Sequence, residues 1–470
     1  MSTIETTPEQ QSMLTPLAAA AAVREGFRSG ITRPLEWRRE QLIALDRMIA
    51  ENAEEFERAV RDDLGKPGLE AFLTEVAAVR MEVAQTLELI GTWTAEREVE
   101  SPPAALPATA SIHREPLGTV LVIAPWNYPV HLLFLPAIAA IAAGNAVVLK
   151  PSEVVPATSA LVARLVPGYL DPRAIRVVEG AVAETTELLE FPWDHIFYTG
   201  NGAVGRIVMA AAAKHLTPVT LELGGKSPVW VDDSADLDAT AKWLAWGKFL
   251  NAGQTCVAPD YVLTTADVRP RLVEALRREI TAMYGTDPRT SADFGRIVNE
   301  RHLNRLVGLL PESGVSIGGE WEAADLYIAP TVLEDVTLQD PVMGEEIFGP
   351  ILPILTVGGP DEAIGIINDR DKPLALYAFT NSAATQRAFL ERTSSGSLVV
   401  NAVILQLAVH ELPFGGVGAS GMGAYHGEHG IRTFSHDKAF LVKHDGPDLM
   451  AISRPPFTPE KEQMLRGASA

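Results

Sequence analysis

The feature that most constrains the fold of this chain is a repeat of apolar strand, loop and helix between residues 119 and 222. It begins with an uninterrupted apolar strand from Thr119 to Ala124, a predicted helix from Leu132 to Ala143 and a second apolar strand from Ala146 to Leu149. Two parallel strands joined by a helix form a βαβ unit, and strands this apolar are buried on both faces. The pattern continues with helices over Thr158 to Leu165, Ala183 to Glu190 and Val204 to His215, and with strands over Ile175 to Glu179 and His195 to Thr199. The repeat predicts a doubly wound, parallel-sheet α/β domain, whose ligands bind at the carboxyl ends of the strands.

A glycine-rich turn follows the last of these strands. Gly200-Asn201-Gly202-Ala203-Val204-Gly205 has the spacing G-x-G-x-x-G between a strand and a helix, as a phosphate-binding turn requires. The spacing alone is weak evidence in a chain with 37 glycines. The same fingerprint asks for an acid about 20 residues further on to bind the ribose, and Glu222 is that acid. Alternatively, Lys150 and Glu153, at the end of an earlier strand, bind the ribose, and the pattern leaves both open.

Cys256 is the single cysteine of the chain. A free thiol has a pKa near ~8.5, so only a small fraction is thiolate at neutral pH, but that fraction is a strong nucleophile. A single cysteine forms no disulfide within the chain and suits a reducing compartment. A buried, inert thiol is the commoner arrangement for an isolated cysteine, so the surrounding motifs have to decide its role.

The remaining segments extend the α/β plan. Residues 17–62 and about 69–97 have helical apolar spacing, and the polar alternation from Ala108 to Glu115 predicts an edge strand or an arm. Beyond the repeat, strands are predicted over Val229 to Val231, Tyr261 to Thr264 and Leu398 to Val400, and helices over Asp236 to Phe249, Pro270 to Met283, Asp361 to Asn368 and Ala383 to Arg392. These elements predict a second α/β domain, with the active site between the two domains.

Charge and hydropathy exclude several classes of partner. Lys and Arg total 39 and Asp and Glu total 60, a net charge of −21, which disfavours binding to a phosphate backbone, so we expect no nucleic acid partner. The longest apolar run, Leu132 to Gly144, contains Pro136 and is too short to span a bilayer. Met1 to Pro16 lacks the basic flank and apolar core of a secretory signal, and the tail from Arg454 to Ala470 is polar. We expect a cytoplasmic protein without a membrane anchor.

We predict no metal site. His410, His426, His429 and His436 are the residues that would suggest one, but no cluster of His, Cys and acidic residues has tight ligand spacing. Solvated or structural histidines are the simpler interpretation.

Several motifs together resemble one enzyme family. They are Pro125-Trp126-Asn127-Tyr128-Pro129, Leu221-Glu222-Leu223-Gly224-Gly225-Lys226-Ser227-Pro228, Asn251-Ala252-Gly253-Gln254-Thr255-Cys256 and Glu345-Glu346-Ile347-Phe348-Gly349-Pro350. In this order they look like the NAD(P)-dependent aldehyde dehydrogenase superfamily, over nearly the whole chain. Other segments resemble its class 3 branch of fatty, aromatic and coniferyl aldehyde dehydrogenases: Tyr198-Thr199-Gly200-Asn201, His215-Leu216-Thr217-Pro218-Val219-Thr220, Pro413-Phe414-Gly415-Gly416-Val417-Gly418, Gly423-Ala424-Tyr425-His426-Gly427 and Thr433-Phe434-Ser435-His436.

The resemblance implies catalytic roles for three residues. Cys256 becomes the nucleophile, Glu222 the general base and Asn127 an oxyanion donor, although Asn127 by pattern alone would more simply cap the following helix. Cofactor contacts are implied for Trp126, Lys150, Glu153, Gly200, Asn201, Gly202, Gly205, Leu223, Glu346 and Phe348. By pattern alone, Glu346 and Phe348 would be an exposed acid and a core aromatic. Lys226, which could be a solvated charge, is left without a role.

The implied chemistry explains these residue types. A Cys256 thiolate adds to the aldehyde carbon, and the negative oxygen needs fixed donors, which the Asn127 amide and the Cys256 N–H provide. Hydride transfer to the nicotinamide then leaves a thioester, and Glu222 activates the water that releases the acid. The alternatives are transfer of the acyl group to coenzyme A, against which Glu222 argues, and a thiol esterase without a redox step.

The resemblance also implies an organisation of the chain. Residues 1–97 and 116–222 form the dinucleotide-binding domain, 223–430 the catalytic domain, 98–115 with 431–445 an oligomerisation arm, and 446–470 a C-terminal tail. We expect a homodimer. We expect NAD or NADP as cofactor, with NAD slightly favoured because Glu153 repels a 2′-phosphate.

Overall fold

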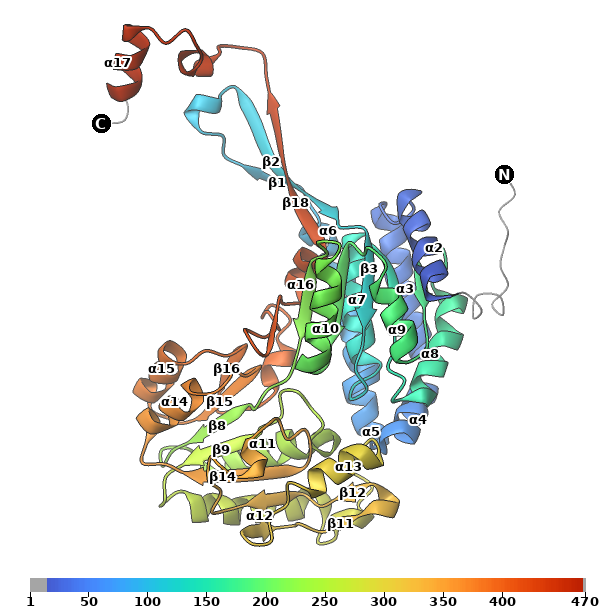
Figure 1. Cartoon of the computed structure of the whole chain (residues 1–470), viewed down its shortest axis with the longest axis vertical. Helices are drawn as coiled ribbons and strands as arrows, with labels where there is room; N and C mark the ends of the chain where they lie inside the picture. The colour runs from blue at the N-terminus through green and yellow to red at the C-terminus, as the bar shows by residue number, and fades with distance from the viewer. Residues whose placement is uncertain (1–14, 468–470) are drawn as a thin grey trace.

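The computed structural model describes residues 15–467, so most of the Met1 to Pro16 segment assessed for a signal lies outside the described residues. Figure 1 shows two lobes and a long arm that projects from them. The chain opens with helices that pack on the first lobe, and a π-helical turn interrupts them. They are α2 (Pro16–Arg28), α3 (Leu35–Glu51), α4 (Ala53–Leu64), α5 (Gly68–Ala71), the π turn η1 (Phe72–Ala77) and α6 (Ala78–Trp93).

The first lobe is built on a parallel sheet, as the strand repeat predicts. Among the described residues its order is β17-β7-β6-β3-β4-β5, with only β17 antiparallel. Its strands are β3 (Thr119–Ile123), β4 (Ala146–Lys150), β5 (Ile175–Val177), β6 (His195–Thr199), β7 (Val219–Glu222) and β17 (Gly421–Met422). Its helices are α7 (His131–Ala143), α8 (Pro156–Tyr169), α9 (Val182–Leu189), α10 (Gly202–Ala213) and α16 (Gly427–Thr433). The strand order reverses between β3 and β6, so a ligand crevice is expected at the ends of these two strands.

The second lobe carries a second, mostly parallel sheet in the order β10-β13-β14-β9-β8-β15-β16. Its strands are β8 (Pro228–Val231), β9 (Tyr261–Thr264), β10 (Val315–Ile317), β13 (Thr331–Leu333), β14 (Ile351–Thr356), β15 (Ala375–Phe379) and β16 (Ser397–Val400). Its helices are α11 (Leu237–Phe249), α12 (Arg269–Tyr284), α13 (Glu300–Val307), α14 (Pro360–Asn368) and α15 (Ala383–Arg392), and a small ribbon joins β11 (Trp321–Glu322) to β12 (Tyr327–Ile328). The predicted α/β fold class is therefore confirmed.

The arm is a three-stranded antiparallel sheet that pairs distant parts of the chain. It consists of β1 (Arg97–Val99), β2 (Ala108–Pro116) and β18 (Ser435–Lys443). β2 and β18 pair over their full lengths, from Ser435 opposite Pro116 to Lys443 opposite Ala108. The C-terminal helix α17 (Pro459–Gly467) lies at the far end of the arm in Figure 1.

Two predicted element ends are wrong for identifiable reasons. The helical pattern expected to reach residue 97 ends at Trp93, because the chain turns there into β1 and Arg97 pairs with Ile112. The helix expected to begin at Val204 begins at Gly202, because the Asn201 side chain accepts a hydrogen bond from the Val204 N–H and caps the helix. Within residues 15–467, none of the helices combines the length and the apolar character needed to cross a membrane.

Candidate active site

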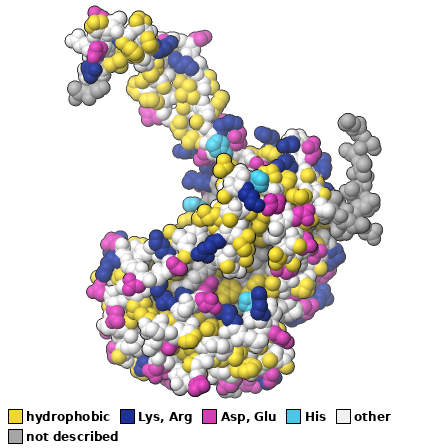
Figure 2. All heavy atoms as spheres, viewed as in Figure 1, with side chains coloured by type: hydrophobic (Ala, Val, Ile, Leu, Met, Phe, Trp, Pro, Cys, Tyr) yellow, Lys and Arg dark blue, Asp and Glu magenta, His cyan; other side chains and the backbone are white. Residues whose placement is uncertain are grey.

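The residues predicted to act on a ligand lie around the reversal point of the first sheet. Trp126 and Asn127 follow β3, Gly200 follows β6, and Glu222 is the last residue of β7. Parallel strands place these carboxyl ends at one edge of the sheet. Segments of the second lobe approach this edge, and Figure 2 shows a hollow between the two lobes.

Glu222 carries a buried carboxyl group. It is 2% exposed, and neither of its carboxylate oxygens has a hydrogen-bond partner among the described residues. Pairing with Gly421 of β17 and a hydrogen bond from the Leu223 N–H to the Ser420 carbonyl hold its backbone. Burial raises the pKa of Glu222 well above its ordinary value. Such a carboxyl can take a proton from water or from a thiol, as the base assignment requires.

The loop that carries Cys256 has an unusual backbone. After α11, the short turn η3 (Leu250–Gly253) contains left-handed residues, with φ of 52° at Asn251, 51° at Ala252 and 76° at Gly253. A side chain at Gly253 would also place its Cβ 2.3 Å from the carbonyl oxygen of Gly349. Only glycine fits this position, so the turn fixes the path of the chain into Cys256.

The Cys256 thiol is half-buried beside two acids. Burial, with smaller contributions from the charges of Glu346 and Glu222, raises its pKa to about 12. The thiol is therefore protonated at neutral pH in the free protein. Glu222 and Glu346 are therefore close enough to the sulfur for their charges to affect the pKa of the thiol.

Asn127 is tied to the cysteine loop. Its side-chain Nδ2 donates to the Gln254 carbonyl at 3.0 Å, and its own carbonyl accepts from Asn251 Nδ2 at 2.8 Å. Helix α7 begins at His131 with Val130 as its N-cap. The helix-cap interpretation of Asn127 is therefore wrong.

Glu346 and Phe348 come from a segment of the second lobe, and their side chains lie against Gly224 and Trp126. The Glu346 carboxylate fills the space beside Gly224, where a Cβ would lie 2.1 Å from its Oε2. The Phe348 ring meets Trp126 edge to face, with centroids 5.4 Å apart. Burial raises the pKa of Glu346 to about 8. Both side chains are half-buried, so the pattern-only interpretation as an exposed acid and a core aromatic is wrong.

Lys226 anchors that segment. Its Nζ forms a buried ion pair with Asp260 and donates to the carbonyls of Val342 and Glu345 at 2.8 and 2.9 Å. Asp260 in turn accepts from the Ile347 N–H at 2.9 Å. The interpretation of Lys226 as a solvated charge is wrong, because its side chain is only 9% exposed.

The residues of the first lobe that were predicted to contact a cofactor lie at the carboxyl ends of β4, β6 and β7. Gly205 packs on Leu223, where an added Cβ would lie 3.0 Å from the leucine side chain, and Gly200 lies against the Tyr198 hydroxyl. Gly205 therefore lets the start of α10 pack closely against Leu223, which directly follows β7. The N-terminus of α10 is partly exposed, and a helix N-terminus of this kind suits a phosphate. Lys150 is buried, with its Nζ 3.9 Å from Glu153, whose side chain is 47% exposed.

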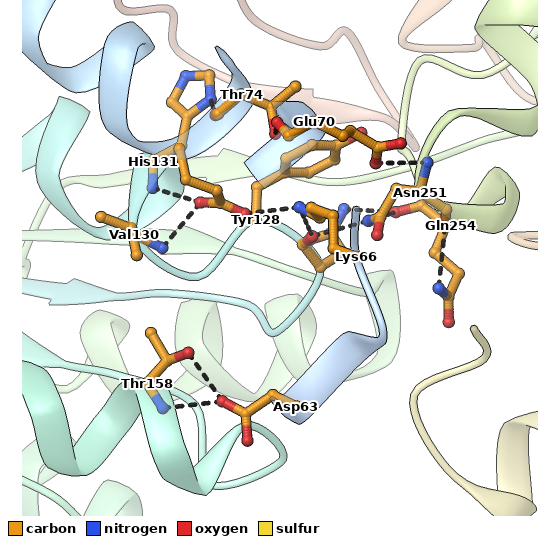
Figure 3. Close-up of polar contacts among 12 residues, drawn as sticks. Asp63, Lys66, Glu70, Thr74, Tyr128, Val130, His131, Thr158, Asn251 and Gln254 are labelled. Carbon is orange, nitrogen blue, oxygen red and sulfur yellow. Dashed lines mark hydrogen bonds and ion pairs between the residues drawn. The ribbon is translucent and has the colours of Figure 1, made fainter. Parts of the chain in front are cut away.

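Some side chains at the site were missed by sequence reasoning. Lys66 donates to the Asn127 carbonyl and to Glu75, and Glu70 accepts from the Asn251 N–H in the loop that leads to Cys256. Figure 3 shows Lys66 and Glu70 beside Tyr128 and Asn251. An acid or lysine inside a helical pattern gives no local signal of this kind. Elsewhere, His410 pairs with Glu82 at 2.9 Å, and no three His, Cys, Asp or Glu side chains of residues 15–467 are grouped so that they could hold a metal ion.

The fold and these motifs define a family, and comparison with known proteins identifies it. A family model described as "Aldehyde dehydrogenase family" matches residues 2–440. The chain belongs to the aldehyde dehydrogenase family, and its reaction is the oxidation of an aldehyde to the carboxylic acid with NAD(P).

The relatives place the chain in the family 3 branch. It is 48% identical to mouse (Mus musculus) aldehyde dehydrogenase family 3 member B2 over 470 residues, which cover 100% of this chain and 98% of the relative. It is 51% identical to the "dimeric NADP-preferring" aldehyde dehydrogenase of Rattus norvegicus over 89% of this chain and 93% of the relative. The substrate-bound structure of Staphylococcus aureus AldH superposes with a TM-score of 0.94 at 39% identity, covering 97% of this chain and 100% of that one.

Proposed function

We propose that Cys256 is the nucleophile, that Asn127 and the Cys256 N–H bind the oxyanion, and that Glu222 is the general base. The observation that supports this most directly is Glu222: a fully buried carboxyl without a hydrogen-bond partner among the described residues, close enough to Cys256 to raise the pKa of its thiol. A purely structural acid in this position would be expected to have partners for its oxygens. A carboxyl that has no hydrogen-bond partner and lies beside a nucleophile is instead suited to proton transfer.

The residues then share the reaction as follows. The Cys256 proton passes to the Glu222 carboxylate, and the sulfur adds to the aldehyde carbon, which places a negative charge on the former carbonyl oxygen. Asn127 Nδ2 stabilises that charge, although in the free protein it donates to the Gln254 carbonyl. A bound NAD(P) would supply the hydride acceptor, and loss of a hydride from the tetrahedral carbon leaves a thioester on Cys256. Glu222 takes a proton from a water molecule whose oxygen attacks the thioester carbon, so that the carbon–sulfur bond breaks and the acid and the Cys256 thiol are released.

For the cofactor, we propose that Lys150 and Glu153 contact the adenosine ribose, that the start of α10 from Gly200 to Gly205 lies at the diphosphate, and that Trp126, Leu223, Glu346 and Phe348 surround the nicotinamide side. Glu153 repels a 2′-phosphate, which favours NAD. The names of the relatives point towards NADP. We propose that both are used, with NAD slightly favoured, and the ratio of kcat/KM for the two cofactors tests this.

We further propose a homodimer that forms through the arm. Strand β18 exposes a run of apolar side chains, with Phe440 51%, Leu441 58% and Val442 37% exposed, and Figure 2 shows apolar side chains gathered on the arm. A relative's name includes the word dimeric. A molar mass of about one chain by light scattering would contradict the dimer. The proposed compartment is the cytoplasm, which fractionation of cells tests.

The catalytic assignment is tested with an aldehyde and each cofactor. We expect absorbance of the reduced nicotinamide with the parental protein and none with Cys256→Ala, while that variant still binds cofactor. Turnover by Cys256→Ala at the parental rate would contradict the assignment.

A further inference from the structure

For the proposed chemistry, the Asn127 amide and the Cys256 sulfur have to stay at a fixed distance from each other. The loop with Asn127 follows β3 in the first lobe, and the loop with Cys256 follows α11 in the second lobe. An error of ~1 Å in the placement of a reacting group can cost about 10²-fold in rate. Whatever side chains join the two loops therefore act on catalysis without touching the substrate.

Lys66 and Glu75 both form hydrogen bonds with the loop that carries Asn127. Figure 3 shows Lys66 beside Tyr128, and Val130 and His131 nearby. Lys66, which is 0% exposed, donates from Nζ to Glu75 Oε1 at 2.7 Å and to the Asn127 carbonyl at 3.2 Å. The other oxygen of Glu75 accepts from the N–H groups of Val130 at 3.1 Å and His131 at 3.0 Å. The pair thus binds the loop on both sides of Tyr128, whose ring lies under Lys66 Nζ at 4.0 Å.

The hydrogen bonds at Glu75 favour the ionised carboxylate. Each of the contacts just described is one in which Glu75 accepts a hydrogen bond, from a lysine and from two backbone N–H groups. Burial raises its pKa, and these donors oppose that change. Glu75 also lies in the π-helical turn η1, a local irregularity that is frequent at functional sites.

Glu70, from the same segment as Lys66 and Glu75, forms a hydrogen bond with the loop that leads to Cys256. Its Oε1 accepts from the Asn251 N–H at 2.9 Å, at the first left-handed residue of the turn that leads to Cys256. The Asn251 side chain then joins the loops, because its Nδ2 donates to the Asn127 carbonyl at 2.8 Å and is 3.3 Å from the Gln254 carbonyl. The Asn127 carbonyl therefore accepts from both Lys66 and Asn251.

We propose that Lys66, Glu70 and Glu75 are positioning residues that set the Asn127 amide relative to the Cys256 sulfur. They form a brace from one short segment, residues 66–75, to both catalytic loops. The proposal rests on the oxyanion role proposed for Asn127.

The test compares Glu70→Ala with Glu70→Gln, since glutamine keeps an oxygen that accepts from Asn251. The rate constant of the first burst of reduced nicotinamide is measured, because it follows acylation of Cys256 rather than product release. We expect Glu70→Ala to lower this rate constant by about 10- to 100-fold, with KM for the cofactor unchanged and with Glu70→Gln close to the parental value. Leu69→Ala, at an adjacent side chain that is 72% exposed, serves as the matched control.

A double-variant cycle separates positioning from general damage. In an Asn127→Ala background the amide is already absent, so adding Glu70→Ala is expected to lower the burst rate by less than about threefold. The same cycle with the paired change Lys66→Met and Glu75→Gln removes both buried charges together, which avoids leaving one charge alone. An equal fold-loss in both backgrounds, or a failure of Glu70→Gln to restore the rate, would overturn the brace.

These experiments also separate the positioning role of Lys66, Glu70 and Glu75 from the oxyanion role proposed for Asn127. If Asn127→Ala itself leaves the burst rate unchanged, the oxyanion role of Asn127 is wrong and the brace falls with it. If Asn127→Ala lowers the rate and Glu70→Ala leaves it unchanged, the oxyanion role stands and only the brace is wrong.

Discussion

The hydroxyl groups of Tyr128 and Thr255 lie 2.6 Å apart, one in the loop after β3 and the other next to Cys256. Both side chains are buried, each 7% exposed. This hydrogen bond is a direct side-chain contact between the loop that carries Asn127 in the first lobe and the loop that carries Cys256 in the second. The two lobes therefore meet at the place where the reaction is proposed to occur.

Tyr128→Phe removes the hydroxyl that contacts Thr255 but keeps the aromatic ring beneath Lys66 Nζ. The loss leaves the Thr255 hydroxyl buried without this partner, which typically costs about 1–3 kcal/mol. We expect a lower free energy of unfolding in urea and a fall in kcat of about 3- to 10-fold, with an unchanged cofactor affinity. Unchanged stability and kcat would show that the hydrogen bond contributes nothing to the alignment of the loops.

Gly253→Ala is expected to disable the nucleophile loop. Its Cβ would lie 2.3 Å from the Gly349 carbonyl oxygen, and backbone atoms cannot move aside as a flexible side chain can. Gly30→Ala is the matched control, since Gly30 has a φ of 82° but its added Cβ meets only a side-chain atom at 3.9 Å. We expect Gly253→Ala to lower Tm and activity far more than the control. Equal effects would mean that backbone strain, rather than the contact with Gly349, requires glycine at 253.

The reactivity of Cys256 is expected to rise steeply with pH in the free protein. Because its pKa is raised to about 12, the thiolate fraction grows about tenfold for each pH unit throughout the neutral range. Alkylation by iodoacetamide, followed by intact mass, should rise about 100-fold between pH 7 and pH 9. A plateau below pH 9 would contradict the raised pKa.

Glu346→Gln should speed that alkylation at pH 9. The charge of Glu346, whose own pKa is about 8, is present at this pH and raises the pKa of the thiol. The exposed neighbour Glu345 provides the control, since Glu345→Gln removes a charge from a side chain that is 68% exposed. Equal rates for the two variants would show that the charge of Glu346 does not contribute to the raised pKa of Cys256.

The first sheet was predictable because its strands are uninterrupted apolar runs, such as Thr119–Ile123, which is buried along its length. The proposed roles of Asn127 and Glu222 were not predictable in this way. By pattern alone Asn127 would cap a helix and Glu222 would bind a ribose, and only the family resemblance implied the catalytic roles. The ends of some elements were not predictable either, because long-range pairing decides them: β1 forms where Arg97 meets Ile112.

The brace was not predictable from local sequence. Lys66 and the Asn127 carbonyl are 61 residues apart in the chain, and Glu70 and Asn251 are 181 apart. Lys66, Glu70 and Glu75 lie in or next to a pattern that reads only as a helix, and Lys226 likewise has the local appearance of a surface charge. Buried polar side chains such as these are identified by their partners, which only the tertiary structure supplies.

The role proposed for Glu222 is tested by the intact mass of Glu222→Gln after mixing with an aldehyde and NAD. Without the carboxylate that activates water, the protein should produce about one equivalent of reduced nicotinamide per site and then stall as a thioester. We predict a mass increase equal to the acyl group, located on Cys256 and absent when Cys256→Ala is added. Steady turnover of Glu222→Gln at the parental rate, with no added mass, would contradict the account.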